Sequence, residues 1–207
     1  MDIVKVFIAL LVLVNPVGAM PVFVSLTPNA SDEERRHIAQ TTCKAIAIII
    51  MIFALLGDSL IRFLGISLGS FQVGGGLLVL LIALGMMNAK PETTKTTRQE
   101  QDEAEIKPNI AVVPLAMPLM TGPGTIGTVI IYAGTAKTWM DTGALILCGC
   151  AIALLSYVVL RTAAPFSRIL GKTGINIVNR VMGMLLAALS IEIMADGLIR
   201  LFPKLVN

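Results

Sequence analysis

Long apolar stretches alternate with short polar ones along almost the whole chain. Six apolar stretches reach the roughly 20 residues that an α-helix needs to cross the hydrocarbon core of a bilayer. They cover Ile3–Leu26, Ile38–Ile61, Leu68–Met87, Ile110–Ala136, Thr142–Leu160 and Ile177–Leu201. The pattern predicts an all-α integral membrane protein with six transmembrane helices.

The composition supports a membrane protein. Hydrophobic residues make up 56% of the 207 residues, charged residues make up 14%, and the mean hydropathy is +0.85. An average soluble protein has about 25% charged residues, and a soluble fold of this size has too little interior to bury the apolar excess. A cytosolic enzyme, a disulfide scaffold and a disordered protein are therefore excluded.

Charge and residue types argue against several other kinds of site. The net charge is only +3, and no basic stretch is interleaved with aromatic residues, so nucleic acid is not an expected partner. Three cysteines and one histidine make a metal site unexpected. With one histidine and no Gly-x-Ser-x-Gly motif, we expect no enzyme activity, and nothing predicts a cofactor.

Two local motifs bear on the first two spans. Lys5, the apolar run after it and the small residues at Gly18 and Ala19 resemble a short signal peptide. However, apolar sequence resumes at Val22–Leu26, and removing the segment would leave an odd number of spans. Before the second span, Ser31 and Glu34 predict a capping box at a helix start.

A mixed-charge block divides the chain almost in half. It runs from Ala89 to Pro108 and is typical of a solvated linker. We therefore expect a first three-helix half at 1–88, a charged cytoplasmic linker at 89–108 and a second three-helix half at 109–207, within one membrane domain.

The two halves resemble each other at a nearly constant offset. Pro16 corresponds to Pro123 and Gly76 to Gly183, each 107 residues apart. The motif Arg62–Ser67 corresponds to Arg168–Thr173 at an offset of 106. Because each half holds three spans, the second half must enter the membrane in the opposite sense. The sequence thus predicts two inverted-topology repeats, an architecture of many secondary transporters.

The distribution of basic residues predicts the orientation. With alternating spans, five Lys and Arg residues fall on the side of the termini and eleven on the other side. Basic residues favour the cytoplasmic side. We therefore expect both termini to face the periplasm or the cell exterior.

The first and fourth spans are interrupted at corresponding places. The interruptions are Asn15–Pro21 and Thr121–Thr125, and both are rich in proline and glycine. Such residues unwind a helix, and the freed backbone groups must face protein, water or a ligand. Bare N–H groups suit a carboxylate, whereas exposed carbonyls suit an ammonium group or a cation.

Paired interruptions favour a substrate-binding site over proline kinks that only shape helix packing. The expected binding residues are Asn15, Pro16, Gly18, Thr121, Gly122, Pro123 and Gly124.

Three further polar residues lie within predicted spans. Gln72 and Asn179 correspond at an offset of 107, and they could line the pathway or only hydrogen-bond between helices. Glu192 is a candidate for proton coupling, because ionisable groups within a membrane are often functional. Asp196 and Arg200 are better explained as an interfacial pair.

Four motifs carry a resemblance to a known family across essentially the whole chain. They are Leu13–Phe23, Gly65–Phe71, Val113–Gly124 and Thr173–Gly183. On these motifs the chain resembles the MarC family of bacterial inner-membrane proteins, and its YchE-like branch in particular. The resemblance implies six spans, an inner-membrane location and a relationship to transporters of small neutral amino acids such as glycine and alanine.

These observations predict a secondary transporter that moves a small neutral amino acid by alternating access. No ATP-binding motif is present, so coupling to H⁺ or Na⁺ is expected. An exporter of amino acids or other small metabolites fits the same symmetry. A membrane scaffold that transports nothing is the alternative from another class. The lipid bilayer is the expected environment, and a homo-oligomer is compatible with the sequence.

Overall fold

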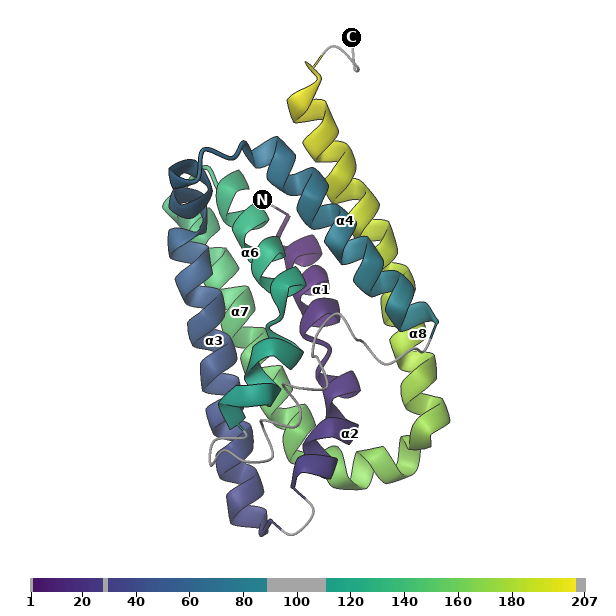
Figure 1. Cartoon of the computed structure of the whole chain (residues 1–207). Coiled ribbons are helices and arrows are strands. Elements are labelled where there is room, and N and C mark those ends of the chain that lie inside the picture. Colours follow the sequence, from purple (N-terminus) through teal and green to yellow (C-terminus); the bar gives the residue numbers. More distant parts are fainter. Residues whose placement is uncertain (1, 28–29, 89–110, 204–207) are drawn as a thin grey trace.

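A computed structural model describes residues 2–27, 30–88 and 111–203 of the chain (Figure 1). Within these ranges every regular element is a helix, which confirms the predicted fold class at this level. The helices are α1 (Ile3–Val14), α2 (Pro16–Leu26), α3 (Asp32–Phe63), α4 (Leu68–Met87), η1 (Ala111–Met120), α6 (Pro123–Thr135), α7 (Trp139–Arg161) and α8 (Ala163–Leu201).

Five helical stretches of the described residues are long and apolar enough to cross a membrane. They are Ile3–Leu26, Asp32–Gly57, Leu68–Met87, Trp139–Arg161 and Thr173–Leu201. The remaining predicted span, Ile110–Ala136, begins outside the described residues and falls on two shorter helices, η1 with 10 residues and α6 with 13. The predicted linker at 89–108 also lies outside the described residues.

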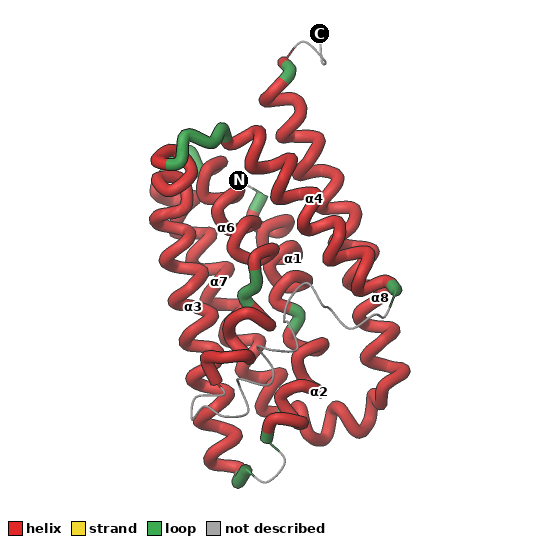
Figure 2. The backbone as a smooth tube through the Cα atoms, in the orientation of Figure 1, coloured by secondary structure: helices red, strands yellow, loops and turns green. Residues whose placement is uncertain are grey.

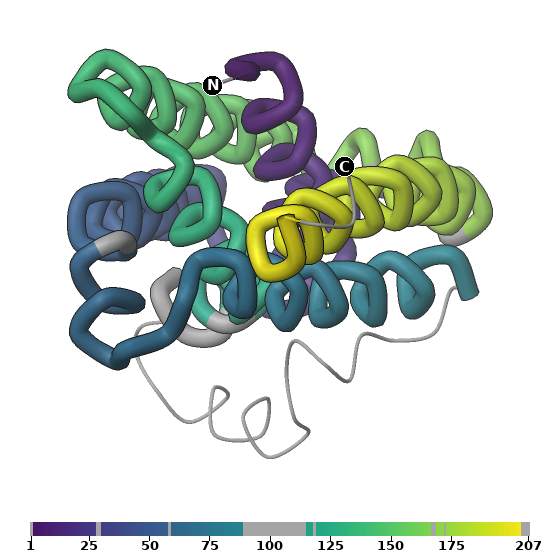
Figure 3. Tube along the Cα trace, turned by 90° about the horizontal axis from the view of Figure 1, so that it is seen from above, coloured from purple at the N-terminus to yellow at the C-terminus, as the bar shows by residue number. Residues whose placement is uncertain are grey.

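The helices form three layers. Figure 3 shows α4 and α8 along one side and α3 and α7 along the other, with α1 and α6 between them. Figure 1 shows the same arrangement from the side. Buried apolar side chains fill the space between the middle layer, α3 and α7; examples are Leu10, Met20, Ile46, Leu115 and Ile152. A second buried cluster joins α1 to α4 and α8 through Leu13, Ile82 and Leu186.

Hydrogen-bonding side chains fix where the long helices begin. At the start of α3, the Ser31 hydroxyl accepts a hydrogen bond from the Glu34 backbone N–H, and the Glu34 carboxylate accepts one from the Ser31 N–H. The capping box predicted from these two residues is therefore confirmed. Thr138 and Asp141 form an equivalent box at the start of α7.

Two glycines with positive φ lie at the bends that lead into α4 and into the later part of α8. Gly65 has φ +68° in the connection between α3 and α4, and Gly171 has φ +59° at a sharp bend inside α8. Glycine adopts this conformation without the penalty that a Cβ brings. These glycines occupy matching places in the motifs Arg62–Ser67 and Arg168–Thr173, so both copies of the motif hold a glycine with positive φ.

Small residues allow α4 and the later part of α8 to pack closely as an antiparallel pair. A Cβ added to Gly76 would lie 3.1 Å from the Ser190 carbonyl oxygen. A Cβ added to Gly183 would lie 2.9 Å from the Ala83 carbonyl oxygen. The two contacts are equivalent under the repeat offset, since 76 + 107 = 183 and 83 + 107 = 190. Corresponding glycines of the two helices therefore make equivalent close contacts with the partner helix.

Candidate functional site

The first interruption is a single residue, Asn15, between α1 and α2. The prediction of an interruption over Asn15–Pro21 is too long, since α2 begins at Pro16 and contains Pro21. The Asn15 backbone is left-handed, with φ 45° and ψ 62°, and this residue ends one helix and caps the next. The Asn15 side-chain oxygen accepts a hydrogen bond of 3.1 Å from the Gly18 N–H, while Pro16 occupies the first position of α2. Proline suits that position because its missing N–H would have no partner there. The sequence of the interruption thus explains its geometry.

The second interruption lies at Thr121 and Gly122, between η1 and α6. It is shorter than the predicted Thr121–Thr125, because α6 already begins at Pro123. Gly122 is extended and caps α6 with no side-chain hydrogen bond, and Pro123 occupies the first position of that helix, as Pro16 does in α2. Thr121 is fully buried, and its hydroxyl donates a hydrogen bond of 2.6 Å to the Ala116 carbonyl. Figure 2 shows both interruptions as loops near the middle of the bundle.

The two interruptions are neighbours across the middle layer. α1 packs against both η1 and α6. A Cβ added to Gly124 would lie 3.4 Å from Cδ2 of Leu13, two residues before Asn15. The same Cβ would lie 2.6 Å from Cδ1 of Ile82 on α4. The structure therefore brings together the two predicted groups of binding residues, with α4 beside them.

Asn179 reaches the first interruption from α8. The Asn15 amide nitrogen donates a hydrogen bond of 3.1 Å to the Asn179 side-chain oxygen. Two residues that the sequence selected separately therefore form one polar contact in a largely apolar bundle. This contact fastens α8 to the point where α1 ends and α2 begins.

Gln72, the repeat counterpart of Asn179, has no equivalent contact. Gln72 is 2% exposed, and its side-chain oxygen finds no hydrogen-bond donor among the described residues. Its Cβ lies close to Gly197 of α8 rather than at the second interruption. A buried oxygen without a donor costs about 1–3 kcal/mol. The two corresponding amides therefore have different environments.

A groove opens beside the second interruption. Its volume is about 390 Å³, and it is lined by Phe71, Met117, Thr121, Gly122, Pro123, Ile126, Gly127 and Ile130. Three of the seven predicted binding residues thus line one cavity, whereas Asn15, Pro16, Gly18 and Gly124 are not among its lining residues. The lining is mostly apolar, so the groove suits an apolar group better than a charged one.

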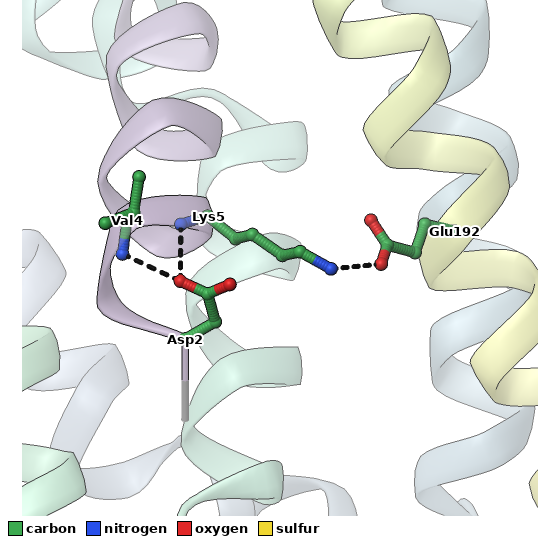
Figure 4. A network of polar contacts seen from close by, with 4 residues as sticks. All are labelled: Asp2, Val4, Lys5 and Glu192. Atoms are coloured by element: carbon green, nitrogen blue, oxygen red, sulfur yellow. Dashed lines mark hydrogen bonds and ion pairs between the residues drawn. The ribbon is translucent and has the colours of Figure 1, made fainter.

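Glu192 forms an ion pair with Lys5 of α1 (Figure 4). Both side chains are about half exposed, and Lys5 lies in the first turns of α1, where Asp2 caps the helix. The sequence selected Glu192 but missed Lys5. The signal was available, since an ionisable residue within a span needs an opposite charge. The pair is a second link between α1 and α8. It lies near the start of α1, whereas Asn15 lies at the end of that helix.

The described residues contain no group of three or more His, Cys, Asp or Glu side chains placed to hold a metal ion. The polar groups at the interruptions are instead amides, hydroxyls and backbone N–H and C=O groups. Such groups bind small polar or zwitterionic ligands by hydrogen bonds and helix dipoles.

Comparison with known proteins identifies relatives across the whole chain. A family model described as "MarC family integral membrane protein" matches residues 1–202. The chain is 39% identical to "UPF0056 membrane protein YhcE" of Escherichia coli over 203 residues, covering 98% of this chain and 94% of the relative. It is 42% identical to a UPF0056 membrane protein of Aquifex aeolicus, covering 94% and 91%. No solved structure matches the chain.

Proposed function

The chain belongs to the MarC family of integral membrane proteins, and within that family we propose that it is a secondary transporter of small neutral amino acids such as glycine and alanine. It works by alternating access and is driven by an H⁺ or Na⁺ gradient. One observation carries this proposal. Two helix interruptions, each followed by a proline that begins the next helix, are distant in sequence and adjoin each other in the middle of the bundle.

Three structural correspondences support an inverted-repeat architecture. In this architecture the interrupted segment Ile110–Ala136 is also a membrane span, which brings the total to six. Pro16 and Pro123 begin equivalent helices, and Gly65 and Gly171 both have positive φ. The contacts of Gly76 and Gly183 between α4 and α8 are also equivalent under the repeat offset. A three-span repeat that occurs twice must be inverted, and interrupted helices at corresponding places mark the binding site in such transporters.

The chemistry of the interruptions suits a zwitterion. The first turn of α6 has backbone N–H groups beside Gly122 and no side-chain cap, so it can receive a carboxylate. The Asn15–Asn179 pair offers amide oxygens and carbonyls that can receive an ammonium group. Apolar residues of the neighbouring groove, such as Phe71 and Ile126, leave room for a small apolar side chain.

We further propose that the protein lies in the bacterial inner membrane with both termini on the periplasmic side. The excess of basic residues on the opposite side supports this orientation. Glu192 is the ionisable candidate for proton coupling, although its pairing with Lys5 also gives it a structural role.

Uptake into reconstituted vesicles tests the proposed function. Purified protein is placed in liposomes, and labelled glycine or alanine is supplied with an inward H⁺ gradient, an inward Na⁺ gradient or neither. We expect gradient-dependent uptake of at least one of these amino acids. Loss-of-function cells that accumulate the solute would indicate export. Absence of flux for every small amino acid, in either direction, would overturn the proposal.

A scaffold role makes a different prediction for the same site. Function would survive Asn15→Ala, Gly18→Leu and Thr121→Ala, and only changes in the segment 89–108 would abolish it. Measuring these variants in cells and in vesicles separates the two functions.

A further inference from the structure

A small polar cavity lies between α2, α3, α7 and the start of α8, and none of its lining residues belongs to the two interruptions. Its volume is about 100 Å³. Its polar lining residues are Thr27, Asp32, Arg35 and Arg161. Two guanidinium groups and one carboxylate therefore share one cavity, and its lining has a net charge of +1. Figure 1 shows the end of α2 and the starts of α3 and α8 at the same end of the bundle.

The cavity lies at the level where membrane-spanning helices begin and end. One span ends at Leu26, directly before Thr27. The next span begins at Asp32, and another ends at Arg161. The polar headgroups of a bilayer occupy this level, on either side of the hydrocarbon core. The charged side chains of the cavity are therefore at the depth of lipid phosphates.

The end of α2 holds the Arg35 side chain at the cavity. The Nε and Nη2 atoms of Arg35 donate hydrogen bonds of 3.3 and 2.8 Å to the Thr27 carbonyl. Thr27 is itself buried, and its hydroxyl donates to the Phe23 carbonyl. Because the guanidinium is already oriented, it loses little conformational freedom when it binds an anion.

The start of α8 adds a further positive end to the same cavity. Ala164 and Pro165, in the first turn of α8, line the cavity. No side chain caps this helix, because the Thr162 hydroxyl donates instead to the carbonyls of Val158 and Val159. The positive end of the helix dipole thus reinforces the two guanidinium groups, and this combination attracts an anion.

The corresponding place in the other half of the chain has no arginine. At the offset of 107 that relates the capping boxes of α3 and α7, Arg35 corresponds to Thr142. Arg161 corresponds to Ala54 at this offset and to Leu55 at the offset of 106. The packing of these helices therefore does not by itself require arginine at either position. Both arginines lie at the end of the bundle that we propose to be cytoplasmic, where basic pockets between helices bind lipid headgroups.

We propose that this cavity binds the headgroup of phosphatidylethanolamine, whose phosphate is negative and whose amine is positive. Arg35 and Arg161 bind the phosphate oxygens, since guanidinium groups match the geometry of phosphate. The exposed carboxylate of Asp32 binds the ammonium group. The cavity has about the volume of three water molecules, at about 30 Å³ each, and so has room for the phosphate. This inference does not depend on the proposed transport function.

The residues beside the cavity favour a lipid over a free phosphate ion. The first part of α8, before the bend at Gly171, crosses the end of the bundle and is not part of a membrane span (Figure 1). Phe166 and Ile169 on this part are 49% and 80% exposed. Apolar side chains of an interfacial helix contact the acyl chains of the bilayer. A lipid whose headgroup occupies the cavity can therefore lay its chains against the same segment.

Native mass spectrometry of the full-length protein tests the site. Delipidated protein in detergent is titrated with phosphatidylethanolamine, phosphatidylglycerol or inorganic phosphate. We expect wild-type protein to bind phosphatidylethanolamine most tightly. Arg161→Gln should bind it at least about tenfold more weakly, because hydrogen bonds between charged groups are the stronger ones. Asp32→Asn should lose the preference over phosphatidylglycerol, since it removes the partner of the ammonium group.

Arg200→Gln is the matched control, because it removes an exposed arginine from the last turn of α8. Melting curves without lipid check that each variant folds. Arg161→Lys, which keeps the charge but not the planar guanidinium, is the second variant and should bind the lipid more weakly than wild type.

Three results would overturn the proposal. The first is equal lipid binding by wild type, Arg161→Gln and Arg161→Lys, or equal losses in Arg161→Gln and Arg200→Gln. The second is a wild-type preference for phosphatidylglycerol, which contradicts the role of Asp32. The third is binding of inorganic phosphate that depends on Arg161 while no lipid is retained, which would make the cavity a site for free phosphate.

Discussion

The Asn15 side-chain nitrogen donates a hydrogen bond of 3.1 Å to the side-chain oxygen of Asn179, across 164 residues of sequence. The contact lies where α1 ends and α2 begins, and it connects the interruption to α8. Asn15 also caps α2 through Gly18 while its backbone is left-handed. One side chain therefore fixes the local turn and the position of a distant helix.

Replacing Asn15 separates the contribution of its side-chain hydrogen bonds from that of its left-handed backbone. Asn15→Ala removes both hydrogen bonds and disfavours the left-handed backbone, whereas Asn15→Gly removes the bonds but permits that backbone. We expect Asn15→Ala to lower the free energy of unfolding by about 1–2 kcal/mol and Asn15→Gly by less. Both should reduce uptake in vesicles. Thermal unfolding in detergent and labelled amino acid uptake measure the two effects.

The matched control for Asn15 is Asn88→Ala, at the exposed end of α4, where the side chain donates to the Leu84 carbonyl of its own helix. We expect near-normal uptake for this variant. Equal losses in Asn15→Ala and Asn88→Ala would contradict a special role for the interruption.

Gly76 tests the close packing of α4 against α8. A Cβ there would lie 2.5 Å from Cγ of Met194 and 3.1 Å from the Ser190 carbonyl oxygen, so Gly76→Leu must push the helices apart. We expect a loss of about 1–3 kcal/mol in the free energy of unfolding, as for other overpacked interiors. Gly74→Leu is the control because a Cβ at Gly74 meets nothing within 4 Å. Indistinguishable melting curves for the two variants would refute this packing.

Thr121 tests the second interruption. Its hydroxyl bonds to the Ala116 carbonyl, but the Thr121 backbone N–H donates to the same oxygen at 2.8 Å. Thr121→Val therefore leaves that carbonyl with a partner, and we expect a stable protein with reduced uptake. Thr121→Ser, which keeps the hydroxyl, should retain uptake. Thr135→Val is the control, since that hydroxyl bonds near the end of α6 away from the interruption. Normal uptake by Thr121→Val would show that the Thr121 hydroxyl is not part of the binding site.

Lys5 and Glu192 test whether their pairing or the carboxyl group itself matters. Because both side chains are about half exposed, we expect little change in melting temperature for Lys5→Met or Glu192→Gln. Each variant removes a link between α1 and α8, so both should change uptake in the same direction. The exchanged pair, Lys5→Glu with Glu192→Lys, should restore it. Loss of proton-gradient dependence in Glu192→Gln alone would instead identify Glu192 as the coupling residue.

Several features were predictable from the sequence because local physical chemistry determines them. Apolar length identified membrane-spanning helices, and five of them agree with the described helices. The Ser31–Glu34 capping box and the interruption at Asn15 depend on residues within a few positions of each other. Pro16 and Pro123 begin helices for the same local reason, because proline fits the first helical position. These predictions needed no knowledge of distant contacts.

The sequence also placed Asn15, Asn179, Gln72 and Glu192 among the candidate residues, but it could not show which of them meet. That depends on how α8 lies against α1, which is decided by the packing of small residues and apolar side chains far apart in the chain. The tertiary structure joined Asn179 to Asn15 and Glu192 to Lys5, and it left the Gln72 oxygen without a donor among the described residues. A repeat in sequence predicts equal halves. Only the packing of the helices decides which of two corresponding side chains finds a partner, because that depends on contacts between residues far apart in the chain.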